Sequence, residues 1–106
     1  MRRASLKDMV GGWFIGNFQP SVIQSEQFEV TVRKYAKGDC EPKHFQLIAT
    51  EITVIVEGQA RMGDQILGPS DIIVLDPKDS FDFEALTEVT VVAVKFPSVP
   101  NDKVLD

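Results

Sequence analysis

Much of the chain alternates apolar and polar residues over short stretches. Residues 28–35 and 51–57 carry an apolar side chain at nearly every second position, which is the period of a β-strand with one buried face. In the second stretch Ile52, Val54 and Val56 share one face, whereas Ile55 lies on the face of Glu51. The alternation therefore predicts a strand but leaves open whether Glu51 faces solvent or the interior.

Further strands follow at regular intervals. Residues 60–67 predict a hairpin that turns at Gly63-Asp64. Residues 72–75 are all apolar, as in a strand covered on both faces. Residues 81–84 and 88–96 alternate again. Gly, Pro and Asp separate these stretches, so the pattern predicts an all-β sandwich or barrel rather than alternating strands and helices.

Both ends of the chain are less regular. Residues 12–18 concentrate Trp13, Phe14, Ile15 and Phe18, which predicts an edge strand or an arm that packs on a partner subunit. We expect at most one helical turn in residues 1–10 and an irregular tail over residues 97–103.

Composition narrows the class of protein. The 106 residues fit one domain, and no apolar run approaches the roughly 20 residues of a membrane span. The net charge of -5, without a basic cluster, disfavours nucleic acid and membrane surfaces as partners. Cys40 is the single cysteine, and we expect a cytoplasmic protein without a signal peptide or an internal disulfide.

Five residues stand at a spacing that carries chemical meaning: Gly38, His44, Gln46, Glu51 and Gly58. Intervals of five, one, four and six residues separate them. This series resembles the first motif of the cupin superfamily, with Gln46 where the second histidine of the family stands. Residues 70–78 resemble the second cupin motif, and the third metal-binding histidine would then fall at Phe81.

The resemblance covers about residues 28–96 and implies a cupin-type double-stranded β-helix, an all-β jelly-roll barrel with a ligand pocket in its mouth. We therefore expect a single cupin domain over residues 1–106, in which residues 1–20 form an N-terminal arm or edge strand. In such a barrel Phe81 and Phe83 would point inward. Arg33 and Tyr35 share a strand face, and we expect them to be solvated rather than to line the pocket.

Metal-bearing cupins hold iron, manganese, nickel or zinc with three histidines and a glutamate. By resemblance the metal ligands here would be His44, Gln46 and Glu51. His44 is the only histidine of the chain, whereas sites for first-row metals usually collect two or three imidazoles. We therefore expect no cofactor, with a divalent transition metal as the alternative.

The resemblance implies three functions. The first is binding of a small molecule, such as a sugar or sugar nucleotide, inside the barrel. His44-Phe45-Gln46 resembles a segment of the nucleotide-sugar 3,5-epimerases, in which the histidine is a general base, so His44 is the candidate catalytic residue. The second is a metal-dependent isomerase, epimerase or dioxygenase. The third is a noncatalytic dimeric interaction module, because a fold does not dictate a function.

We expect a homodimer. The aromatic cluster of residues 12–18 would present apolar side chains on both faces of a strand. Packing on its own barrel would bury only one face, so a second subunit is expected to cover the other, by strand exchange if the arm is mobile.

Overall fold

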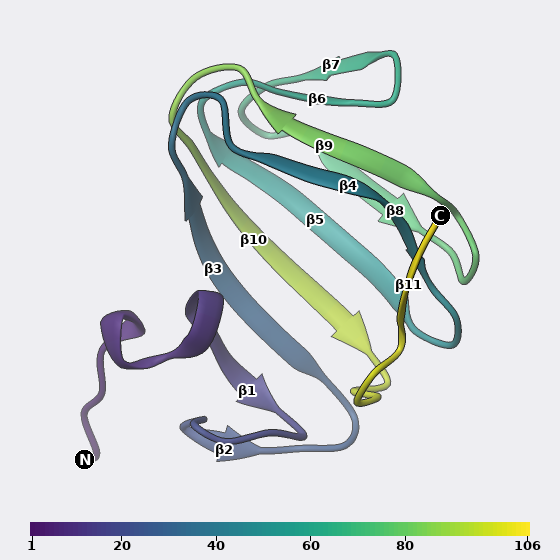
Figure 1. Ribbon diagram of the computed structural model, residues 1–106. Coiled ribbons are helices and arrows are strands. Elements are labelled where there is room, and N and C mark those ends of the chain that lie inside the picture. Colours follow the sequence, from purple (N-terminus) through teal and green to yellow (C-terminus); the bar gives the residue numbers. More distant parts are fainter.

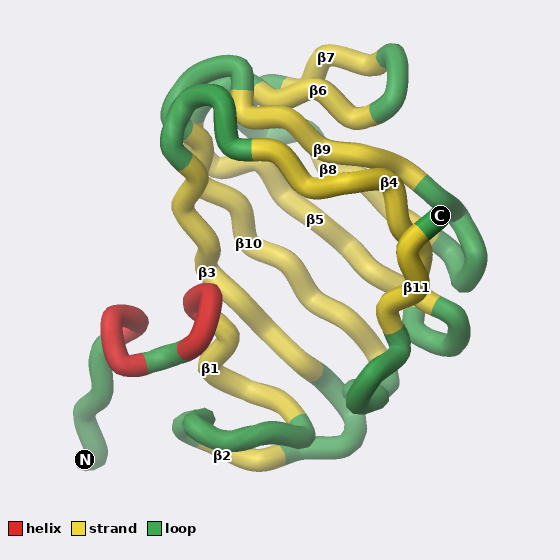
Figure 2. The backbone as a smooth tube through the Cα atoms, viewed as in Figure 1, coloured by secondary structure: helices red, strands yellow, loops and turns green.

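Two β-sheets that face each other across a shared interior make up most of the molecule (Figure 1). The computed structural model describes residues 1–106. Eleven strands and two short 3-10 turns, η1 (Leu6–Asp8) and η2 (Val10–Gly12), form the regular structure (Figure 2). None of the helical turns is long or apolar enough to cross a membrane.

The larger sheet has six strands in the order β2-β1-β3-β10-β5-β8. Every neighbouring pair in it is antiparallel except β1 and β2, which are parallel. Its strands are β1 (Trp13–Gly16), β2 (Ile23–Gln24), β3 (Glu29–Tyr35), β5 (Thr50–Glu57), β8 (Ile72–Leu75) and β10 (Val89–Phe96).

The smaller sheet has five strands in the order β11-β4-β9-β6-β7, and all its pairs are antiparallel. Its strands are β4 (Cys40–Gln46), β6 (Ala60–Met62), β7 (Gln65–Leu67), β9 (Phe81–Ala85) and β11 (Lys103–Leu105). The predicted strands and the hairpin are confirmed. The tail is not wholly irregular, because β11 pairs with β4.

The turns form where their residues allow tight backbone geometry. Asp39, Asp71 and Asp79 each accept a hydrogen bond from the backbone N–H three residues earlier, at 2.8, 2.8 and 2.9 Å, as aspartate does in turns. Gly58 has a φ of +82°, and a Cβ there would collide with the carbonyl oxygen of Glu88. Glycine is therefore required where β5 ends.

The six-stranded sheet turns aliphatic side chains outward. Residues paired across neighbouring strands share a face, and the register aligns two outward rows. Ile72, Val54, Val92 and Val32 form one row; Val74, Ile52, Val94 and Val30 form the other. Ile72 and Val74 are 64% and 55% exposed. The expectation that residues 72–75 are covered on both faces is therefore wrong for the single chain.

The inward face of the same sheet is mixed in character. Thr31, Thr53 and Ala93 lie opposite one another and are buried. Glu51, two residues before Thr53 on β5, lies on the same inward face. The alternative left open by the sequence is thereby decided: the interior face of β5 carries Glu51, Thr53 and Ile55.

The hydrophobic core fills one end of the barrel. Its seven buried residues come from both sheets: Ile55, Ala60, Leu67, Phe83, Ala85, Val89 and Val91. Tyr35, Met62 and Ile73 pack against this cluster. Further along the strands the inward side chains become polar, and there the interior opens into a cavity.

The first residues of the chain cover part of the outward face. Phe14 shares a groove with Leu6, Met9 and Val32, while Trp13 points into the barrel. Both faces of β1 thus have contacts within the chain, and residues 12–18 are half-buried except Gly16, which is buried. Part of the apolar surface on which the expectation of a second subunit rests is covered within the chain, and the homodimer itself stays a prediction.

Candidate functional site

A cavity of about 200 Å³ lies between the two sheets and borders the core, since Phe83 and Val91 belong to both. Both sheets contribute polar side chains to its lining. Those used below are Trp13, Arg33, Tyr35, Glu51 and Lys95 from the six-stranded sheet, and Glu41, His44, Phe81 and Lys103 from the five-stranded sheet.

Strand register brings Glu51 and Lys95 together. Glu51 on β5 lies directly opposite Lys95 on β10, and Lys95 lies opposite Glu29 on β3. Side chains in such pairs start about 4.5–5.5 Å apart at Cβ. One ammonium group therefore stands between two carboxyl groups on the inner face of the sheet.

A bulge in β4 turns Glu41 and His44 to the same side. Glu41 pairs with Phe83 and His44 with Phe81, so two residues of β4 stand against Asp82 alone. Proline is found in sheets chiefly at edges and bulges because it lacks an N–H donor, and Pro42 occupies this bulge. In a regular strand, residues three positions apart, such as Glu41 and His44, would point to opposite faces.

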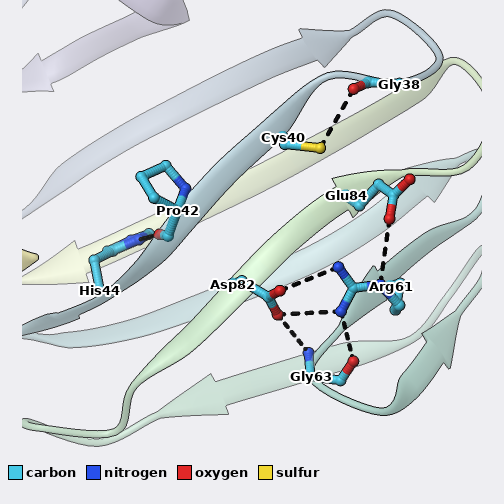
Figure 3. A network of polar contacts seen from close by, with 8 residues as sticks. All are labelled: Gly38, Cys40, Pro42, His44, Arg61, Gly63, Asp82 and Glu84. Carbon is cyan, nitrogen blue, oxygen red and sulfur yellow. Dashed lines mark hydrogen bonds and ion pairs between the residues drawn. The ribbon is translucent and has the colours of Figure 1, made fainter. Parts of the chain in front are cut away.

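The His44 ring is held by its own strand. Its Nδ1 lies 2.8 Å from the carbonyl oxygen of Pro42 (Figure 3). A carbonyl oxygen only accepts hydrogen bonds, so in the neutral ring the proton resides on Nδ1. Nε2 then keeps its lone pair, and His44 is equipped to accept a proton or to coordinate a ligand from the cavity wall.

Glu51 is the half-buried acid of the cavity. Burial raises the pKa of its carboxyl group above the ordinary value, and the nearby Lys95 ammonium and His44 partly offset this rise. A carboxyl group with a raised pKa exchanges protons closer to neutral pH. Glu51 and His44 together give the cavity two groups able to move a proton.

A second polar group lies on the β3 side of the cavity. The Tyr35 hydroxyl donates to Glu41 Oε2 at 3.1 Å, and Arg33 Nη1 lies 3.8 Å from Glu41 Oε1. The Arg33 guanidinium also stacks on the Tyr35 ring, 4.9 Å from its centroid. Burial, and then the Glu41 carboxylate, raise the pKa of Tyr35, so the phenol stays protonated and acts as a donor.

These contacts correct the expectation for Arg33 and Tyr35. Both line the cavity, whereas the sequence favoured solvated positions. The reason is that the face of β3 that carries Arg33 and Tyr35 is turned inward, whereas the face that carries Val30 and Val32 is turned outward.

Neither family models nor curated proteins match the sequence. Solved structures do match its fold. One is a conserved protein with a double-stranded β-helix domain from Klebsiella pneumoniae, with a TM-score of 0.72 and 18% identity over 98% of this chain and 90% of that chain. Another is KdgF from Halomonas sp., with a TM-score of 0.65 and 18% identity over 69% of this chain and 72% of that one.

A third similar structure is a sugar phosphate isomerase of the cupin superfamily from Silicibacter pomeroyi. Its TM-score is 0.62 at 20% identity, over 66% of this chain and 50% of that one. The chain has the cupin fold. The two facing sheets and the mainly antiparallel pairing agree with this assignment, and at these identities the likeness concerns the fold.

Within this cupin barrel the predicted metal ligands are only partly brought together. His44 and Glu51 line the same cavity, but Gln46 does not. Gln46 lies two residues beyond His44 on β4, opposite Lys103 on β11, and lines a neighbouring cavity. Two residues of strand span about 6.6 Å, which carries the Gln46 side chain past the first cavity.

The donor chemistry of the cavity does not fit the metal site of the family. No three His, Cys, Asp or Glu side chains are grouped so that they could hold a metal ion. Phe81 lines the cavity, as predicted from its parity with Phe83, and its ring offers no donor. Lys95, opposite Glu51, places a positive charge beside the carboxylate that a cation would need.

Sequence reasoning missed several polar or aromatic residues of this cupin cavity, among them Trp13, Glu41, Lys95 and Lys103. The Lys95 ammonium lies 4.9 Å from the centroid of the Trp13 ring. A signal for Lys95 was present in the stretch 89–96. Lys95 stands near its end and, as every second residue of a strand shares a face, on the same face as Val91 and Ala93. Lys103 carried no such signal, because its position depends on the pairing of β11 with β4.

Proposed function

We propose that this cupin barrel binds a small polar metabolite in the cavity that His44 and Glu51 line. The observation that carries the proposal is this cavity itself, which is lined by the His44 imidazole, held by its hydrogen bond to Pro42, and by the half-buried carboxyl group of Glu51. Largely preformed pockets with a few polar groups are the usual form of metabolite sites.

The size of the cavity limits the ligand. Its volume of about 200 Å³ corresponds to roughly seven water molecules at about 30 Å³ each. A monosaccharide or a smaller acid fits this space, and the nucleotide of a sugar nucleotide would have to lie outside it. The similarity in fold to a sugar phosphate isomerase supports the carbohydrate alternative.

The chemistry we propose for the bound ligand is proton transfer at a carbon next to a carbonyl group, as an isomerase or epimerase performs it. His44 Nε2 would take the proton as general base, since Nδ1 is held by Pro42. Glu51, whose pKa is raised by burial, is placed to act as the acid. The Tyr35 hydroxyl lies on the opposite wall and, while it donates its proton to Glu41, can accept a hydrogen bond from the ligand.

Proton exchange tests this proposal directly. The protein would be incubated in D2O with aldoses, ketoses and small hydroxy acids, and NMR would follow deuterium entering next to the carbonyl. We expect exchange that His44→Ala abolishes and that the exposed-site variant Lys37→Ala retains. Binding without exchange would reduce the function to that of a sensor or carrier, and no binding by any compound would remove the proposal.

A metal-dependent enzyme is the alternative that the fold suggests. We expect at most weak metal binding, because one imidazole and one carboxylate make a poor donor set. Elemental analysis that finds one tightly held metal per chain, lost in His44→Ala, would favour this alternative. Phe81→His should increase metal affinity by adding an imidazole opposite His44 on β9.

We also propose that the protein is a homodimer, with a second copy on the outward face of the six-stranded sheet. The two aliphatic rows carry no charge, so this face is complementary to itself across a two-fold axis. Exposed apolar patches larger than a few hundred Å² commonly mark interfaces. A noncatalytic scaffold would need only this face.

We propose a cytoplasmic location as well. The single cysteine, Cys40, is exposed and free, which suits a reducing compartment.

A further inference from the structure

A second cavity, of about 250 Å³, adjoins the first at the end of β10 and β11. The two cavities share Lys95 and Lys103, so these two side chains stand at their boundary. Gln46 lines the second cavity and lies opposite Lys103 in the sheet register.

Three donor groups meet there without acceptors of their own. Neither Lys95 nor Lys103 has a carboxylate oxygen within 4.0 Å, and the Lys95 ammonium rests on the Trp13 ring instead. Gln46 is only 5% exposed, and its buried Nε2 has no hydrogen-bond partner. Buried polar groups are nearly always satisfied, so an unpaired amide beside two cations points to an acceptor supplied by a ligand.

The carboxyl groups around this boundary do not supply that acceptor. Asp102 accepts from the backbone N–H groups of Ile48 and Ala49, both at 2.9 Å, and Glu41 is engaged by Arg33 and Tyr35.

The two remaining acids, Glu29 and Glu51, flank Lys95 on the neighbouring strands. Burial raises the pKa of each above its ordinary value, so each carboxyl group holds its proton more tightly than an exposed one does. Their presence nevertheless disfavours a doubly charged group such as a phosphate dianion and leaves room for a singly charged one.

We propose that Lys95, Lys103 and Gln46 hold the carboxylate of a small organic acid, whose remaining atoms reach toward His44 and Glu51. This inference rests on the proposed binding function and names its ligand class. Charge-assisted hydrogen bonds from two ammonium groups and one amide match the acceptor-only chemistry of a carboxylate. The carbon next to the carboxylate then lies on the side of the two proton-transferring groups.

Trp13 provides the readout, because it is the only tryptophan of the chain and lies under Lys95. The probes are lactate and glycerate, each compared with its uncharged amide. We expect saturable changes in fluorescence with the acids and at least tenfold weaker binding of the amides. Lys103→Gln should weaken acid binding by about tenfold or more, the size of one lost charge-assisted contact, and should leave binding of the amides unchanged.

Matched variants separate charge from structure. Lys103→Arg retains the charge and should retain most of the acid binding, and Lys37→Gln removes a lysine from an exposed turn and should change nothing. Gln46→Glu should weaken the acids further by placing a like charge beside them.

The outcomes separate this inference from the proposed function. Equal binding of acids and amides, or acid binding unchanged in Lys103→Gln, would overturn the carboxylate subsite and leave metabolite binding in place. If neither acids nor amides bind, and the wider sugar panel is also silent, both proposals fail.

Discussion

The outer faces of the two sheets differ in character: that of the six-stranded sheet is largely aliphatic, and that of the five-stranded sheet carries charged residues. The six-stranded sheet turns valine and isoleucine outward and places Arg33, Glu51 and Lys95 toward the interior. The five-stranded sheet buries Phe83 and Ala85 and sends charged residues to its outer surface. Both inner faces are mixed, since Ile55 and Val91 of the six-stranded sheet lie in the core and Glu41 and His44 of the five-stranded sheet line the cavity.

The outer surface of the five-stranded sheet shows what a solvated face looks like in this protein. Arg61 there binds both carboxylate oxygens of Asp82, at 3.2 and 3.1 Å, and donates to Glu84 at 3.3 Å (Figure 3). The outer face of the six-stranded sheet has no such network in its aliphatic rows. One outer face thus carries a charged network, and the other is the aliphatic surface on which we propose that a second copy docks.

The largest effect is expected from the apolar interior of the five-stranded sheet. Phe83 is 6% exposed and stacks on Tyr35 with 4.6 Å between ring centroids. Phe83→Ala should lower the free energy of unfolding by about 3–5 kcal/mol, through lost contacts and a cavity. Urea denaturation measures it. Ile66→Ala, at a site 61% exposed on the same sheet, is the control and should cost less than about 1 kcal/mol. Similar costs for both variants would show that this interior is not tightly packed.

The next largest effect concerns assembly, and two isoleucines of similar exposure provide a matched pair. Ile72 is 64% exposed on the six-stranded sheet and Ile66 is 61% exposed on the five-stranded sheet. Ile72→Asp should convert the dimer to a monomer, because a buried unpaired charge opposes association. Ile66→Asp should leave the dimer intact.

Light scattering at micromolar concentration measures both variants. A monomeric wild type, or loss of the dimer in Ile66→Asp alone, would reverse the roles we assign to the two outer faces.

A smaller effect is expected from the polar interior of the six-stranded sheet. Burial raises the pKa of Glu51 above the 4.5 of an exposed glutamate, so the folded state binds this proton more tightly than the unfolded state. The resulting contribution to stability is present below pH 4.5 and is lost as the pH rises through the folded-state pKa.

Glu51→Gln should remove this dependence. The variant should gain stability relative to wild type as the pH rises from about 4.5 toward neutral, as thermal unfolding across that range would reveal. Glu57→Gln, at the exposed end of the same strand, serves as the control. A wild-type and a Glu51→Gln curve that run parallel would mean that Glu51 is fully hydrated in the folded protein.

The smallest effect is expected on the charged outer surface. The Arg61 guanidinium lowers the pKa of Asp82 through hydrogen bonds, but exposed ion pairs contribute little to stability and are screened by salt. Asp82→Asn should shift the thermal midpoint only slightly at low salt and less at high salt. A large, salt-independent loss would mark this network as structural and weaken the contrast between the sheets.

The strands of this protein follow from local pattern and were predictable. The alternation over 28–35 and 51–57, the apolar run 72–75 and the Gly63-Asp64 turn each appear as predicted. Motif spacing also brought His44, Glu51 and Phe81 to one cavity. Such features depend on residues near one another in the chain, so that sequence periodicity records them.

The direction of each face was not predictable in the same way. Val30 and Val32 look like core residues in the sequence and lie outward, whereas Arg33 and Tyr35 look solvated and lie inward. The alternation of residue types along a strand does not say which of its two faces is buried. Only the position of the opposite sheet decides which parity becomes the interior.

The sequence by itself thus determined the class of fold, the order of strands along the chain and the placing of His44 and Glu51 at motif positions. Tertiary structure alone decided that Lys103 reaches the cavity, since β11 joins β4 across more than fifty residues of chain. It also decided that the bulge at Pro42 turns Glu41 inward beside His44. Strand pairing between distant segments sets these contacts, and pairing leaves no periodic trace in either segment taken alone.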